Sequence, residues 1–247
     1  MPGLRPVLLL ALLGFVAGLV VGMPLRWAVP LLPKSLRCDA PSGSLWSGAC
    51  ANLNLDALNL GAVRWTLNPG SLLRGRLGAQ LQVVQPSLSG RASIAIGFGG
   101  RVTAQDVDAQ ISLGGPLLAR YAASLRGTLT LDLEELQFDD GWVRALRGTV
   151  EVSSLEQLSP QPLVLGSYRM QFDADPDSAG RIVGKLRDQG GPLDVEGTLT
   201  LTASPGYELQ GTVLARPGAP PSLEKQIRFL GSPDGAGRRP FAQAETF

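Results

Sequence analysis

The chain has 247 residues and a formal net charge of +1, so no overall electrostatic field would attract nucleic acid or an acidic substrate. It contains no histidine and only two cysteines, which removes the commonest general base and the usual Cys/His ligand sets for zinc. With 31 glycines, 19 prolines and 6% aromatic residues, the predicted core consists of leucine, valine and alanine in a chain divided by many turns.

The first predicted element is an apolar segment at residues 7–29. Val7 to Met23 carry no charge, and a membrane-spanning helix needs roughly 17–25 predominantly apolar residues. A cleaved signal peptide would need a small-x-small cleavage site, which this segment lacks, and apolarity on all sides at the terminus argues against a core helix. We therefore expect residues 1–6 to be a short cytoplasmic N-terminus and residues 7–29 to be an uncleaved transmembrane anchor.

Three glycines in this segment, Gly14, Gly18 and Gly22, lie at four-residue intervals. On a helix they would share one face, and small residues at that spacing let two membrane helices approach closely. We interpret this face as a candidate for self-association or for pairing with the helix of a partner.

The charges around the segment and the two cysteines disagree about its orientation. Arg5 precedes the segment and Arg26, Lys34 and Arg37 follow it, a count that alone would keep the rest of the chain in the cytoplasm. Long domains, however, are translocated largely regardless of flanking charge. We therefore give the cysteines more weight than the charge count.

The two cysteines, Cys38 and Cys50, follow directly after the apolar segment. A close pair in an otherwise cysteine-free chain, beside a membrane anchor, favours a disulfide in an oxidising compartment; the alternative is two unrelated buried thiols. Closing so short a loop would stabilise this region by roughly 3 kcal/mol in the chain-entropy model. We expect a structural disulfide and place the chain after the anchor outside the cytoplasm.

From Leu53 onward the sequence alternates between apolar and polar residues, which indicates strands with one apolar face. The segment VRWTL alternates Val63, Trp65 and Leu67 with two polar residues. The same alternation recurs in residues 77–83, 107–113 and 168–174. The predicted fold is mainly β: an antiparallel meander or curved sheet after a single N-terminal transmembrane helix, with one or two short helices.

A glycine-threonine pair followed by alternation recurs at Gly127, Gly148, Gly197 and Gly211. The irregular intervals exclude a solenoid of fixed period. We interpret each glycine as a turn residue that precedes a strand.

The clearest helical signal lies in PPSLEKQIRFLG, where Leu223, Ile227 and Leu230 would share one face. Ser222 is placed to cap the start of this helix, and Gly231 is placed to end it.

The body of the chain contains no second linker, so we expect one domain. A β-rich periplasmic domain is predicted over residues 30–231. A poorly packed C-terminal tail is predicted over residues 232–247.

Candidate catalytic groups are weak. The acidic pairs Glu134-Glu135 and Asp139-Asp140 would point to opposite faces of a strand, and SGSLWSG lacks both the order of a nucleophile elbow and a histidine to serve it. We therefore predict no enzyme activity, no cofactor and no metal site.

Three segments resemble a known family. They are GSLWSG (43–48), VRWTLNPGSLLRGRL (63–77) and FLGSPDGAGRRPF (229–241). They are similar to the protein N family of the bacterial type II secretion system, in which Trp46 and Trp65 would occupy the two tryptophan positions. That family joins a short cytoplasmic N-terminus and one inner-membrane helix to a β-rich periplasmic domain.

The resemblance implies a non-catalytic component of the inner-membrane platform that exports folded proteins across the outer membrane. The implied location is the bacterial inner membrane, single-pass, with the C-terminal domain in the periplasm. The implied partners are the L and M platform proteins, with the outer-membrane secretin as a further candidate. Trp46 and Trp65 would fix the cysteine-bridged region against the first strands; simple core packing is the alternative.

The same organisation also resembles lipid-handling envelope proteins whose sheets form an apolar trough. This gives a second hypothesis, an envelope protein that binds a lipid or another hydrophobe. A trough needs an apolar face that is open to solvent or lipid, whereas a platform component can bury that face in an ordinary core. The sequence supplies one apolar face and leaves both hypotheses open.

Overall fold

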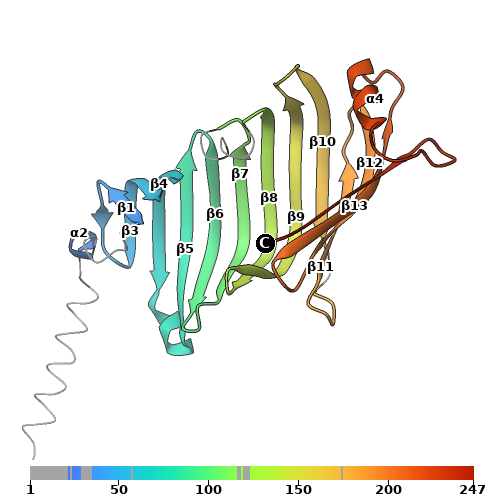
Figure 1. Cartoon of the computed structure of the whole chain (residues 1–247). Helices are drawn as coiled ribbons and strands as arrows, with labels where there is room; N and C mark the ends of the chain where they lie inside the picture. The colour runs from blue at the N-terminus through green and yellow to red at the C-terminus, as the bar shows by residue number, and fades with distance from the viewer. Residues whose placement is uncertain are drawn as a thin grey trace, which may run out of the picture.

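The structure is a computed structural model that describes residues 22, 24–28, 35–56, 58–115, 118, 123–173 and 175–247. Most of these residues belong to one antiparallel sheet of 14 strands. Figure 1 shows the strands side by side in chain order, with the sheet curling at its C-terminal end. The prediction of a mainly β fold with an antiparallel curved sheet and few helices is confirmed.

Strand pairing follows the order of the chain, except that the two-residue strand β2 pairs with β3 beside the main path. The strands are β1 (Leu36–Asp39), β2 (Ser42–Gly43), β3 (Ser47–Leu55), β4 (Leu58–Asn68), β5 (Arg76–Gln85), β6 (Leu88–Gly97), β7 (Val102–Ser112), β8 (Leu125–Asp139), β9 (Trp142–Gln157), β10 (Leu163–Phe172), β11 (Ile182–Asp188), β12 (Leu193–Leu201), β13 (Gly206–Ala215) and β14 (Arg239–Thr246). The short helices are α2 (Leu25–Ala28), the 3-10 helix η2 (Pro69–Arg74) and α4 (Pro221–Ile227).

The strand registers place apolar residues opposite apolar residues across the sheet. Trp65 on β4 lies opposite Leu81 on β5, and Val150 on β9 lies between Leu131 on β8 and Met170 on β10. Because side chains alternate between the two faces with period two, these registers collect the apolar side chains on one face. The other face of the sheet is polar, as the alternation in the sequence predicts.

The four glycines that were predicted to be turn residues lie instead inside strands: Gly127 in β8, Gly148 in β9, Gly197 in β12 and Gly211 in β13. Gly148 shows the reason. Its φ is +127°, and a Cβ at this position would lie 2.6 Å from the Cα of Leu133 on the neighbouring strand. Close approach of two backbones requires glycine here, so the turn interpretation is wrong.

The C-terminal helix differs in its ends from the prediction. Helix α4 begins at Pro221, its N-cap residue Pro220 makes no side-chain capping bond, and it ends at Ile227, before the glycine predicted to end it. The prediction of Ser222 as the cap is wrong because the fixed φ of proline suits the first helical position and moves the start of the helix forward. Leu223 is buried, as its place on the apolar face predicts.

Residues 232–247 do not form a poorly packed tail. They contain β14, which pairs with β13 from Gly206–Thr246 to Val213–Arg239. The low apolar content of this segment concealed the strand, because an edge strand needs backbone pairing more than buried side chains. The sheet therefore continues past residue 231.

Most of the predicted anchor at residues 7–29 lies outside the described residues, and so do Gly14 and Gly18. Gly22 is described as an exposed turn residue. Among the described residues, no helix has the length and apolar character needed to cross a bilayer. The anchor and its glycine face remain predictions.

Candidate functional site

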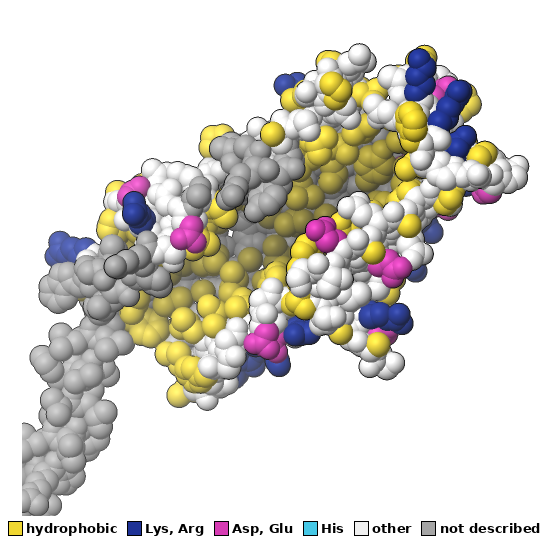
Figure 2. Space-filling view, viewed as in Figure 1, with side chains coloured by type: hydrophobic (Ala, Val, Ile, Leu, Met, Phe, Trp, Pro, Cys, Tyr) yellow, Lys and Arg dark blue, Asp and Glu magenta, His cyan; other side chains and the backbone are white. Residues whose placement is uncertain are grey.

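The apolar face of the sheet forms the inside of its curl. Figure 2 shows hydrophobic side chains lining the hollow between the central strands and the C-terminal strands. No second layer of secondary structure covers this face in the described part of the chain. Two members of the face, Ile96 and Phe138, remain 44% and 36% exposed. We call this surface the apolar trough; it extends over β4–β13.

Within the apolar trough lies a cavity of about 270 Å³ lined by β9, β10, β11 and β12. Its walls are hydrophobic side chains, among them Val150, Met170, Phe172 and Leu199. Tyr168 also lines the cavity, and its hydroxyl donates to the backbone carbonyl of Leu165 at 2.5 Å. Burial raises the pKa of Tyr168, and the nearby Asp188 carboxylate raises it further. Because the Tyr168 hydroxyl is hydrogen-bonded to the backbone and the other walls are hydrophobic, the cavity offers a ligand an apolar lining.

Glycines on the inner face allow the sheet to curl around this cavity. The ring of Phe172 lies over Gly184, where a Cβ would come within 2.5 Å of the ring. Gly197 and Gly211 face each other on β12 and β13. Because a curled sheet crowds the side chains on its inner face, missing side chains at these positions permit tighter curvature.

One end of the apolar trough is closed by contacts between segments far apart in the sequence. Trp142, at the start of β9, donates through Nε1 to the carbonyl of Thr202 at 2.8 Å, and Arg144 donates to the carbonyl of Ala203 at 2.7 Å. The ring of Phe247 lies 6.0 Å from that of Trp142. These contacts hold the β8–β9 turn against the β12–β13 turn, and we call them the clasp.

The opposite end is covered by helix α4. Leu223 of α4 packs in a buried cluster with Leu163, Leu193, Val195 and Val213. This cluster joins α4 to β10, β12 and β13, so a buried hydrophobic cluster closes the α4 end of the trough.

An ion pair and two backbone hydrogen bonds to Asp188 stabilise this α4 end. Asp188 pairs with Arg216 at 2.7 Å and also accepts from the backbone N–H groups of Gly190 and Val195. Desolvation opposes ionisation of Asp188, but the Arg216 bond and the two backbone donors outweigh it, so the pKa of Asp188 lies below its ordinary value.

The predicted disulfide is present. Cys38 and Cys50 are bonded with their Cα atoms 5.4 Å apart, and Cys50 is only 2% exposed. Cys38 lies on β1 and Cys50 on β3, two strands that are also paired in the sheet. The bridge therefore ties the N-terminal edge strand to the rest of the sheet.

The two predicted tryptophans both make hydrogen bonds at the turn between β2 and β3. Trp65 donates through Nε1 to the carbonyl of Leu45 at 3.0 Å, and the carbonyl of Trp46 accepts from the backbone N–H of Leu67 at 2.6 Å. A Cβ at Gly48 would lie 2.6 Å from the Trp65 ring, so this glycine lets the ring pack on the turn. Fixing the cysteine-bridged region remains the proposed role of both tryptophans.

Sequence reasoning missed the clasp. Trp142 is one of four tryptophans in a chain poor in aromatic residues, and it follows a DDG turn. That was the available signal. The sequence does not predict the acceptor, because the Thr202 carbonyl is 60 residues away and comes near Trp142 only through the curl of the sheet.

The acidic pairs also take on structural roles, since Glu135 and Asp139 pair with Arg147 and Arg101.

Comparisons with known proteins assign the chain to a family. Residues 34–242 match the family described as "Type II secretion system (T2SS), protein N".

The chain belongs to the type II secretion system protein N family. A curated member from Aeromonas hydrophila, "Type II secretion system protein N", is 29% identical over 242 residues, covering 94% of this chain and 93% of the relative. A protein of the same name from Vibrio cholerae serotype O1 is 26% identical over 239 residues, covering 91% of each chain. No solved structure matches the chain significantly.

Family membership supports a role in type II secretion, a place in the cell envelope and interaction with other secretion components. The match covers every strand up to the middle of β14, including the disulfide and the apolar trough. Within the described residues, no group of three or more metal-ligating side chains is found.

Proposed function

We propose that the chain is a non-catalytic inner-membrane component of the type II secretion machinery, and that it contributes to export of folded proteins through protein–protein contacts in the platform. The observation that carries this proposal is the family match over residues 34–242. The absence of histidine from the chain also supports a non-catalytic role.

The proposed partners are the L and M platform proteins, with the outer-membrane secretin as a further candidate. The sheet offers two edges for such contacts, β1 and β14, which are the ends of the strand path. An edge strand presents unpaired backbone groups to which a partner strand can add. At β1 the edge is short and disulfide-tethered, whereas β14 spans Arg239–Thr246 and is mostly exposed. We propose β14 as the main contact strand.

Site-specific photocrosslinking in cells tests this proposal. A photoreactive residue at Ala242 on β14 is expected to form adducts with the L or M protein, whereas one at Gln171, on the polar face of the inner strand β10, serves as the control. Absence of platform adducts at Ala242, or unchanged secretion after deletion of the gene, would contradict the proposed role.

We further propose that residues 7–29 anchor the chain in the inner membrane and that the sheet lies in the periplasm. The disulfide supports an oxidising compartment. In intact cells, a small membrane-impermeant thiol reagent that enters the periplasm should label Cys38 and Cys50 only after reduction. Two free thiols that react only after lysis would place the sheet in the cytoplasm.

A second candidate function is the binding of a lipid or another hydrophobe in the envelope. The observation that favours it is the apolar trough, whose 270 Å³ cavity has hydrophobic walls. An apolar face left open to water costs free energy in proportion to its area, so a protein retains such a face when it serves binding. Both candidate functions are compatible within one secretion component.

A further inference from the structure

We propose that the apolar trough binds the acyl chains of an anionic phospholipid, with the phosphate-bearing headgroup held at the α4 end. This inference rests on the second candidate function, hydrophobe binding. It adds the class of ligand, the strands that hold its chains and the end of the trough at which its charge lies.

The cavity favours hydrocarbon over a peptide. An extended peptide brings backbone N–H and C=O groups that need hydrogen-bond partners. Burying such a group without a partner costs several kcal/mol on the scale of transfer from water to cyclohexane. Val150, Phe172 and Leu199 offer no such partner. Acyl chains are narrow and need no hydrogen bonds.

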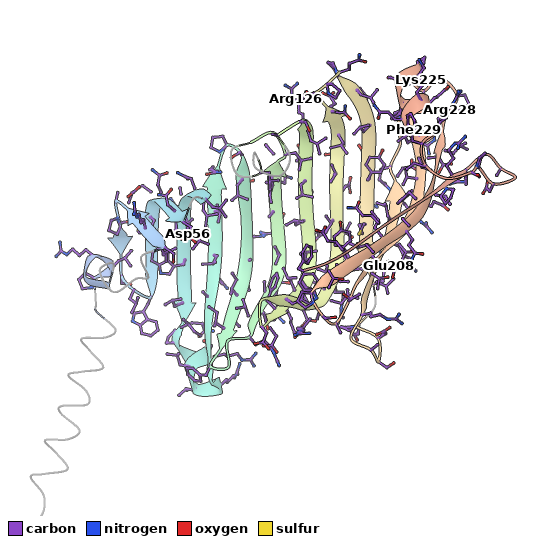
Figure 3. All side chains as sticks on the ribbon, in the orientation of Figure 1. Asp56, Arg126, Glu208, Lys225, Arg228 and Phe229 are labelled. Atoms are coloured by element: carbon purple, nitrogen blue, oxygen red, sulfur yellow. A yellow bond between two sulfur atoms is a disulfide. The ribbon has the colours of Figure 1, made fainter. Side chains whose placement is uncertain are left out.

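The charge at the α4 end favours an anionic headgroup. Figure 3 shows Arg126, Lys225 and Arg228 at the same end of the sheet. All three are exposed, and in the described part of the chain none has a carboxylate within ion-pair distance. Figure 2 likewise shows Lys and Arg side chains gathered at that end. A phosphate there would accept charge-assisted hydrogen bonds from these three side chains, in place of the hydrogen bonds that they make to water.

Two carboxylates in this region leave the cations in excess. Glu156 lies opposite Arg126 in the β8–β9 register without an ion pair, and Glu224 precedes Lys225 on α4. Arg239 adds a further cation, because its guanidinium donates to the carbonyls of Leu230 and Gly231 rather than to a carboxylate.

The cations lie within reach of the cavity. Val152 lines the cavity and is paired with Leu129 on β8. Arg126 lies three residues from Leu129 along the same strand, a distance of about 10 Å, and its side chain starts on the polar face near the end of that strand. Tyr168 and Leu186 line the cavity and also pack against the buried cluster that contains Leu223 of α4, so the cavity lies close to the helix that carries Lys225 and Arg228.

Phe229 adds an apolar contact with the bilayer beside the cations. It is 91% exposed and lies next to Arg228, directly after α4. An exposed aromatic ring next to basic residues is typical of surfaces that lie at a lipid interface. Phe229 would let the α4 end touch the bilayer from which the phospholipid is taken.

In-cell photocrosslinking on the full chain tests the acyl-chain part. A photoreactive residue replaces Leu199, which lines the cavity, or Thr198, its exposed neighbour on the opposite face. Mass spectrometry of the labelled peptides is expected to find a phospholipid on the Leu199 variant and none on the Thr198 variant. Met170 and Gln171 on β10 provide a second matched pair in case one substitution prevents folding. Protein adducts in place of lipid, or no lipid at either cavity position, would overturn the proposal together with hydrophobe binding.

Charge reversal tests the headgroup part separately. With the crosslinker at Leu199, the triple change Arg126→Glu, Lys225→Glu, Arg228→Glu should lower the ratio of phosphatidylglycerol to phosphatidylethanolamine adducts about tenfold. The matched triple Arg64→Glu, Arg74→Glu, Arg76→Glu changes the net charge equally at the other end of the sheet and should leave the ratio unchanged. Lipid adducts with an unchanged ratio in the first triple would overturn the anionic headgroup while leaving hydrophobe binding intact.

Discussion

Cys50 is nearly inaccessible, and its partner Cys38 lies on the terminal strand of the sheet, so the disulfide holds an edge that has few other contacts. We expect Cys38→Ser to lower the stability of β1 and β3 by up to about 3 kcal/mol in the chain-entropy model. Hydrogen exchange under oxidising conditions should show lost protection in these strands and little change in β10–β13. Equal protection in the variant and the wild type would contradict a stabilising role.

Asp188 connects β11 to the residues that follow β13 through its bond to Arg216. Its pKa is lower in the folded chain than in the unfolded chain, so its contribution to stability is present above the unfolded value, about 3.9, and is lost as the pH falls through the folded value. We therefore expect Asp188→Asn to lower the melting temperature at pH 7 and to match the wild type more closely below about pH 4.

A melting series between pH 3 and pH 7 checks this expectation. Asp132→Asn removes an exposed carboxylate that has no ion pair in the described part of the chain, so it controls for the loss of charge alone. A difference between wild type and Asp188→Asn that stays constant over this range would show that the Arg216 pair does not depend on ionisation of Asp188.

At the scale of elements, β14 owes its position to one aromatic side chain as well as to backbone pairing. Phe241 lies over two glycines: a Cβ at Gly211 would come 2.5 Å from its ring, and one at Gly197 would come 3.4 Å from it. An aromatic ring that covers cross-strand glycines replaces the side chains they lack.

We expect Phe241→Ala to destabilise this edge by about 2 kcal/mol, less than a fully buried phenylalanine would cost, because the ring is only half-buried. Hydrogen exchange of β13 and β14 is the measurement. Gln243→Ala, on the exposed part of the same strand, should have a much smaller effect. Equal effects of the two substitutions would show that backbone pairing alone holds β14.

At the scale of the whole molecule, alternation in the sequence predicts the apolar face but not its shape. The pattern at Val63, Trp65 and Leu67 requires one apolar side, and the registers place it there. The curl depends on which glycines meet across strands, as Gly197 meets Gly211, and a single strand's sequence carries no register.

The contacts that close the two ends of the trough could not be predicted from the sequence either. The clasp and the α4 cluster join residues far apart in the chain, such as Trp142 with Thr202, and they form only once the sheet has curled. The disulfide was predictable because its two cysteines are close in the sequence and have no competing partner.

We propose that the chain serves type II secretion and that this role needs the apolar trough of its sheet as well as the contacts of β14. The most direct measurement is secretion of a folded substrate by cells whose only copy carries one added cysteine, either Met170→Cys inside the trough or Gln171→Cys on the opposite face. A small impermeant thiol reagent added after folding blocks one face or the other, because the native cysteines are already bonded. We predict that modification at position 170 stops or strongly slows secretion while modification at position 171 leaves it unchanged. Equal secretion from both modified variants, or loss only at position 171, would contradict the claim.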